Sequence, residues 1–141
     1  MTPFDTALRV KRREVDTVKV SISVEIETIT TLDHQTRAHE IRMREERALA
    51  ATVPIASDAW TLRMRAERAR LDRQSQLAQV RLVHLRAQAV EAYGTMRAIE
   101  GAADRFKDEA ERAAAGAEQA MIDDIAAAKL VIARRNAERS A

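Results

Sequence analysis

The fold is decided by residues 82–120, LVHLRAQAVEAYGTMRAIEGAADRFKDEAERAAAGAEQA. Apolar side chains recur through this stretch at alternating spacings of three and four residues, which is typical of a helix that presents one apolar face to another helix in a coiled coil. We call this line of inward-facing positions the seam. Its members are Leu82, Leu85, Ala89, Ala92, Met96, Ile99, Ala103, Phe106, Ala110, Ala113, Ala117 and Ala120. A chain built this way has no compact core to house a catalytic pocket, so we expect its function to lie in what it contacts.

The composition favours long helices over a globular domain. Aromatic residues make up only 3% of the 141 residues, with one Trp and one Tyr, which is too few for a globular core of this length. Ala, Arg and Glu are abundant, as in coiled coils. The formal charge of +2 predicts no strong attraction to nucleic acid or to an anionic membrane. We therefore expect a protein partner.

Charge is unevenly distributed along the chain. Acidic residues outnumber basic ones by nine to four in residues 91–124, whereas basic residues outnumber acidic ones by nine to six in residues 37–73. This asymmetry predicts two separate contact regions.

Cysteine is absent, which excludes disulfides and thiol chemistry. The first residues lack the apolar stretch of a signal peptide, and no run of about 18 apolar residues could span a bilayer. We expect a cytoplasmic location and no direct membrane insertion.

A first helix is predicted over about residues 4–52. Pro3 suits the first helical position after Thr2, and an apolar or small residue then recurs every seven positions. Val18 and Leu32 fill the intervening positions of this seam, but several polar residues interrupt it. The heptad positions are Leu8, Val15, Ile22, Ile29, Thr36, Met43 and Ala50, and the interruptions are Lys11, Glu25, His39 and Glu46.

Residues 18–27 admit a second interpretation, because apolar and polar residues alternate there as in a strand. No second alternating segment exists to pair with it, and a lone strand is not stable in water. The helix is favoured, and it leaves Val20 and Val24 on the outer face as candidate partner-binding residues.

The one clear break is predicted at about residues 53–58. Pro54 ends the first helix, and Ser57 or Asp58 can cap a second one over about residues 59–137. The sequence thus predicts an all-α fold, a long antiparallel two-helix coiled-coil hairpin in a single domain, residues 1–141. Gly94, Gly101 and Gly116 are expected to bend the second helix without ending it.

The second helix is predicted to overhang the first. The first helix can cover it only to about residue 106, so the Ala-rich stretch beyond needs another partner. Near Met121 the seam steps by four residues and continues through Ile125, Ala128 and Ile132, a stutter that locally unwinds a supercoil.

The side chains that could take part in catalysis or metal binding do not form a recognisable cluster. His34 and His39 are five residues apart, a poor match for one helix face, and His34, His39 and His84 are expected to be solvated or at the seam edge. Asp123 and Asp124 diverge by about 100° on a helix and cannot act as a catalytic pair. No glycine-rich phosphate loop is present, and Trp60 is expected to pack the hairpin tip. We predict no enzymatic activity, cofactor, metal site or nucleic-acid binding.

Three segments resemble the FliJ family of flagellar type III export proteins. Residues 4–14, with Leu8 ahead of Lys11, Arg12 and Arg13, are similar to the start of the family's first helix. Ile55, Ala56, Ser57 and Trp60 resemble a turn-and-tryptophan pattern, and residues 122–126, IDDIA, resemble an apolar, acidic-pair, apolar signature. Length and hairpin layout match over essentially the whole chain.

The resemblance implies a non-enzymatic rod that binds and stimulates a hexameric export ATPase and links it to the cytoplasmic domain of the export gate. It also admits export chaperones as partners, and it implies a peripheral location at the flagellar basal body on the inner-membrane side. The open end would enter the ATPase ring. Its candidate residues are Phe4, Leu8, Val20, Val24, Ala117, Met121, Asp123, Asp124 and Ile125.

The gate contact would fall near the hairpin tip. Its candidate residues are Trp60, Ala66, Arg70, Arg73 and Leu77. The arginines at two of these positions depart from the family's apolar pattern. The alternatives are a self-associating structural coiled coil and the equivalent stalk of an injectisome.

Overall fold

The computed structural model describes residues 2–52 and 58–141. They form two helices, α1 (Asp5–Thr52) and α2 (Asp58–Ser140). The all-α class and the packing of two long helices as a hairpin are thereby confirmed. The expected turn, with Pro54 and Ser57, lies outside the described residues.

The helices belong to two compact units. The hairpin unit comprises residues 10–95, and the end unit comprises residues 2–9 and 96–141. Helix α2 contributes to both. The expectation of a single domain stays a prediction.

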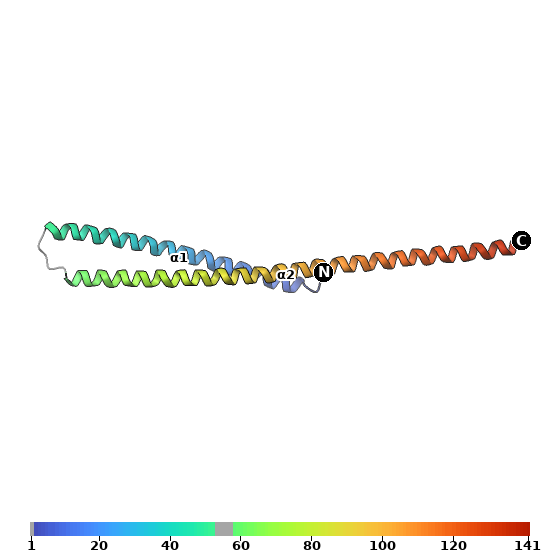
Figure 1. Ribbon diagram of the computed structural model, residues 1–141, viewed down its shortest axis with the longest axis horizontal. Helices are drawn as coiled ribbons and strands as arrows, with labels where there is room; N and C mark the ends of the chain where they lie inside the picture. Colours follow the sequence, from blue (N-terminus) through green and yellow to red (C-terminus); the bar gives the residue numbers. More distant parts are fainter. Residues whose placement is uncertain (1, 53–57) are drawn as a thin grey trace. The chain divides into compact units, whose positions relative to one another are not determined.

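In the hairpin unit, α1 and the first part of α2 run side by side in opposite directions (Figure 1). Cross-helix contacts show this order, because Glu40 meets Arg68 whereas Glu25, earlier in α1, meets Arg81, later in α2. The centre of the core contains Leu32, Leu71 and Ala78, with Ile29 packed against it. Leu71 is 2% exposed and Ala78 is fully buried. This is the packing expected of interlocking seam positions.

The predicted seam of α1 is buried or half-buried from Leu8 to Met43, including the polar positions Lys11, Glu25 and His39. In α2 the predicted positions from Leu82 to Ala103 are also buried or half-buried. The burial ends there, since Phe106 is 43% exposed and the later alanines of the seam are exposed.

Residues 18–27 are helical, so the helix interpretation is confirmed over the strand. Tertiary packing explains this result, because the heptad continues on both sides of the alternating segment and α2 covers its inner face. Val20 and Val24 are 64% and 55% exposed, as the helical register predicts. Helix α2 also passes without interruption through its three glycines.

In the end unit, α1 begins with a cap built from Thr2 and Asp5. The backbone N–H and the hydroxyl of Thr2 donate to the two carboxylate oxygens of Asp5, each at 2.8 Å. These bonds, the backbone bond first, lower the pKa of Asp5 below its ordinary value. Helix α1 thus begins at Asp5, two residues after Pro3, and the bond from the Thr2 backbone N–H to the Asp5 carboxylate is one half of a capping box.

Among residues 2–52 and 58–141, neither helix carries an apolar stretch long enough to traverse a lipid bilayer.

Candidate partner-binding surfaces

Two polar seam positions in the hairpin unit, His39 and Glu25, have hydrogen-bond partners on the other helix. The Nε2 atom of His39 lies 2.9 Å from the carbonyl oxygen of Met64, and since a carbonyl only accepts, Nε2–H donates. His39 is 3% exposed, and its Nδ1 atom is buried without a hydrogen-bond partner among the described residues. The expectation of a solvated or seam-edge histidine is therefore wrong for His39. His34 and His84 are exposed.

Ion pairs flank this buried position. Arg68 donates from Nη1 to Glu40 Oε1 at 2.6 Å and from Nε to Asp72 Oδ1 at 3.1 Å. The hydrogen bond from Arg68 lowers the pKa of Glu40 below its ordinary 4.5. A depressed carboxyl pKa adds stability above that ordinary value, and the contribution is lost as the pH falls through the lowered value. Because the two side chains are 39% and 42% exposed, solvent screens the pair and its contribution to stability is small.

Another cross-helix ion pair stands in place of an apolar seam contact. Glu25 occupies a seam position, and Arg81 Nε donates to its Oε1 at 3.0 Å. The Glu25 side chain is 13% exposed, whereas that of Arg81 is 55% exposed. The arginine therefore covers the carboxylate from the solvent side. An acidic interruption that looked unfavourable in the sequence is thus paired.

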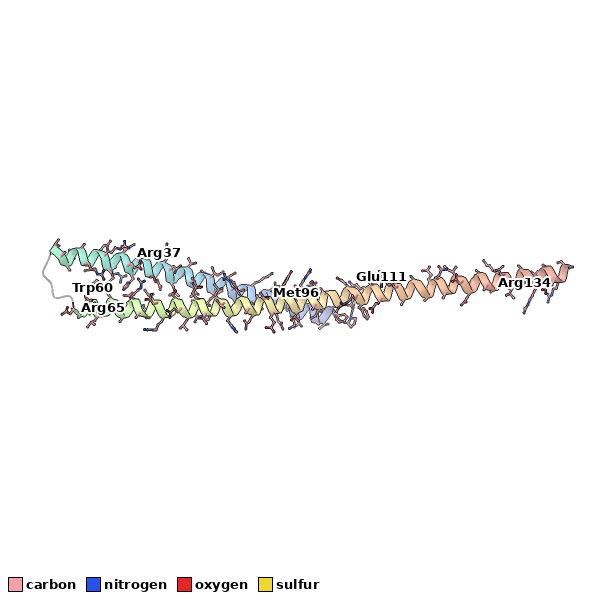
Figure 2. All side chains as sticks on the ribbon, in the orientation of Figure 1. Arg37, Trp60, Arg65, Met96, Glu111 and Arg134 are labelled. Atoms are coloured by element: carbon pink, nitrogen blue, oxygen red, sulfur yellow. The ribbon has the colours of Figure 1, made fainter. Side chains whose placement is uncertain are left out.

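The five predicted gate-contact residues differ in exposure: one is half-buried and four are exposed. Trp60 is half-buried at the start of α2 (Figure 2). Ala66, Arg70, Arg73 and Leu77 are all exposed and follow one another at helical spacings of four, three and four residues. The predicted gate-contact residues therefore share one outward face of α2.

The same part of α2 exposes large apolar side chains that the sequence analysis did not single out. Leu62, Val80, Val83 and Val90 are between 65% and 75% exposed. Their signal was present in the sequence, because they are apolar residues outside the three-four seam. They extend the outer face on which Leu77, 57% exposed, also lies.

A shallow groove runs between the helices of the hairpin unit. It has a volume of about 620 Å³ and is lined from α1 by Val10, Lys11, Glu14 and neighbours and from α2 by Gln88, Glu91, Ala92 and Thr95. It is open to solvent rather than enclosed. Among residues 2–52 and 58–141, no three His, Asp or Glu side chains gather as metal ligands would.

In the end unit, the first residues pack on α2. The rings of Phe4 and Phe106 meet edge to face with centroids 6.1 Å apart, an arrangement favoured by aromatic quadrupoles. Leu8 is 8% exposed and Ala103 is 5% exposed. Phe4 and Leu8 thus close the packed part of this unit, so Leu8 offers little surface to another molecule.

Beyond these contacts, every residue of α2 from Asp104 onward is exposed. Glu111 and Arg134 lie along this exposed stretch (Figure 2). The predicted partner residues Ala117, Met121, Asp123, Asp124 and Ile125 all lie here. Met121 is 63% exposed and Ile125 48% exposed, and Asp123 Oδ1 accepts a hydrogen bond of 2.8 Å from Gln119.

The predicted open-end residues therefore fall into different units. Val20 and Val24 belong to the hairpin unit, whereas the other seven belong to the end unit. Their combination into one binding surface stays a prediction.

Comparisons with known proteins gave no relative, since no family model, no curated protein and no solved structure matches this chain.

Proposed function

We propose that this chain is a non-enzymatic, stalk-like component of a bacterial flagellar type III protein export apparatus, similar to the FliJ family. In this proposal it binds and stimulates a hexameric export ATPase and links that ring to the cytoplasmic domain of the export gate. The observation that carries the proposal is the end of α2, residues 104–141, in which every residue is exposed, even though Phe106 meets Phe4 there.

A solvent-exposed helix of this length is supported only by its own local bonds. Most helical stability in proteins comes from packing an apolar face, and isolated helices are marginal in water. Met121, Ile125 and Ile132 nevertheless remain 48% to 63% exposed. A helix that displays such side chains is suited to insertion into a ring-shaped partner, whose inner wall would cover them.

The proposal is tested by measuring the mass of the full chain by light scattering, with and without a purified hexameric flagellar export ATPase. We expect the chain to shift into a ring-sized complex and to raise the rate of ATP hydrolysis. No shift and no stimulation would refute the proposal.

Val20 and Val24 supply a variant for the same assay. Changing both Val20→Glu and Val24→Glu should reduce the stimulation several-fold while leaving helicity by circular dichroism intact. Val83→Glu is the matched control, since Val83 is 66% exposed on α2 of the same unit, and it should stimulate normally. Equal stimulation by all three proteins would remove Val20 and Val24 from the binding face.

A further inference from the structure

We infer that residues 104–141 pair with the same segment of a second copy of this chain, side by side and antiparallel. This inference does not depend on the proposed export role. It starts from the exposure of every residue in the segment and identifies the partner from the segment's own apolar pattern and charge.

The segment carries one continuous apolar stripe. At 100° per residue, seven residues spaced three or four apart fall within about 40° of the direction of Met121. They are Ala110, Ala114, Ala117, Met121, Ile125, Ala128 and Ile132. Large exposed side chains among them distinguish this stripe from a row of alanines, since Met121, Ile125 and Ile132 are 63%, 48% and 57% exposed.

The stripe is complementary to itself only when the second copy runs in the opposite direction. With Met121 facing Met121 of the second copy, Ala117 faces Ile125 and Ala110 faces Ile132. Ala110 and Ala117 therefore each meet an isoleucine, and Ala114 faces Ala128, so no two isoleucines face each other and the layers can pack closely. In a parallel pair, alanine would face alanine and isoleucine would face isoleucine, which leaves gaps at one layer and crowding at the next.

The charge distribution along the segment also favours antiparallel over parallel pairing. Residues 104–124 contain seven acidic and three basic residues, whereas residues 125–141 contain four basic residues and one acidic residue. Antiparallel pairing places the acidic half of each copy beside the basic half of the other, and parallel pairing places like charges together. Glu111 and Lys129 lie on the same flank of the stripe, so this arrangement brings them together twice.

The opposite side of the helix offers no competing stripe. Leu130 is 72% exposed, but it lies about 180° from Met121. Gly116 also lies on the Leu130 side, about 140° around the helix from Met121, and it has no side chain to contribute. A second copy is therefore expected on the Met121 side alone.

The first test is sedimentation equilibrium of the full chain, without any other protein. We expect a dimer at micromolar concentration. Met121→Lys should raise the dimer dissociation constant at least tenfold, because it places two positive charges opposite each other at the centre. Leu130→Lys, the matched control on the far side, should leave it unchanged. A chain that stays monomeric at about 100 μM, or equal effects of both lysines, would overturn the inference.

Direction is tested by cross-linking, since the chain has no cysteine of its own. The full-length variants Ala114→Cys and Ala128→Cys are mixed under oxidising conditions. Antiparallel pairing predicts disulfides between the two variants in preference to disulfides within either, because only facing positions reach the required Cα separation. Disulfides formed by Ala114→Cys alone would show parallel pairing and contradict the inference.

Discussion

At the scale of single residues, His39 shows how a polar side chain is held within an apolar seam. Its Nε2–H group donates to the carbonyl of Met64, but Nδ1 is buried without a partner among the described residues. An unsatisfied buried polar atom costs about 1–3 kcal/mol. A buried polar seam residue in coiled coils is known to fix register at the expense of stability. His39 is therefore a candidate for that role in this hairpin.

This role predicts that His39→Leu raises the free energy of unfolding by about 1 kcal/mol. Leucine fills the seam and removes the unpartnered Nδ1 atom, and the carbonyl of Met64 keeps its own helical hydrogen bond. The measurement is urea denaturation followed by circular dichroism. His34→Leu, a change at an exposed position of the same helix, should have little effect. A clear loss of stability in His39→Leu would mean that the Met64 contact outweighs the orphaned atom.

At the scale of helices, α1 and α2 differ in how they are stabilised. Seam packing supports α1 from Leu8 to Met43, whereas the end of α2 relies on backbone hydrogen bonds and local pairs such as Gln119 with Asp123. Regions with few apolar contacts open at lower free energy than packed ones. The exposed part of α2 is thus sensitive to helix propensity.

Gly116 supplies the corresponding prediction. A Cβ atom added there meets nothing within 4 Å, so Gly116→Ala gains helix propensity of about 1 kcal/mol without a clash. Amide hydrogen exchange near residue 116 should slow by about fivefold. Exchange around the buried Leu32 should not change. Faster exchange near residue 116 would mean that this glycine is not helical in solution.

At the scale of the whole molecule, the export proposal and the self-pairing proposal assign one face of α2 to two partners. A second copy and the ATPase ring cannot both cover the stripe centred on Met121. Self-pairing would then hold the free protein in a form that the ATPase must open.

A disulfide-locked dimer of Ala114→Cys with Ala128→Cys is therefore expected not to stimulate the export ATPase, and reduction should restore stimulation. The measurement is the rate of ATP hydrolysis before and after adding reductant. The two unmixed, reduced variants serve as controls, and their rates are the reference for the locked dimer. If the locked dimer stimulates as well as the reduced chains, the ATPase ring binds another face of the chain. The self-pairing proposal is tested independently by sedimentation equilibrium.

Much of the fold was predictable because coiled-coil periodicity is local. The first helix was expected over about residues 4–52 and is Asp5–Thr52, and the second was expected over about residues 59–137 and is Asp58–Ser140. The outward positions of Val20 and Val24 also follow from counting along one helix. The seam positions could be predicted without knowing which residue of the other helix lies opposite each one.

The candidate surfaces were less predictable. The sequence placed Met121 and Ile125 on the uncovered end of the second helix, and the family resemblance placed Leu77 in a gate contact. Neither pointed to Leu62, Val80, Val83 or Val90. It also placed Leu8 on a partner surface, whereas Leu8 is buried in the end unit. Exposure depends on how far the other helix reaches, and hydrophobicity alone does not report that distance.

The sequence by itself determined the two helices and the positions of the seam, since both follow from spacings within a few helical turns. Only the tertiary structure decided that Glu25 is covered by Arg81 and that His39 donates to Met64. It also showed that, in the end unit, burial ceases after Ala103. These features depend on which residues the antiparallel register brings face to face across long separations in the chain, and no local pattern encodes that register.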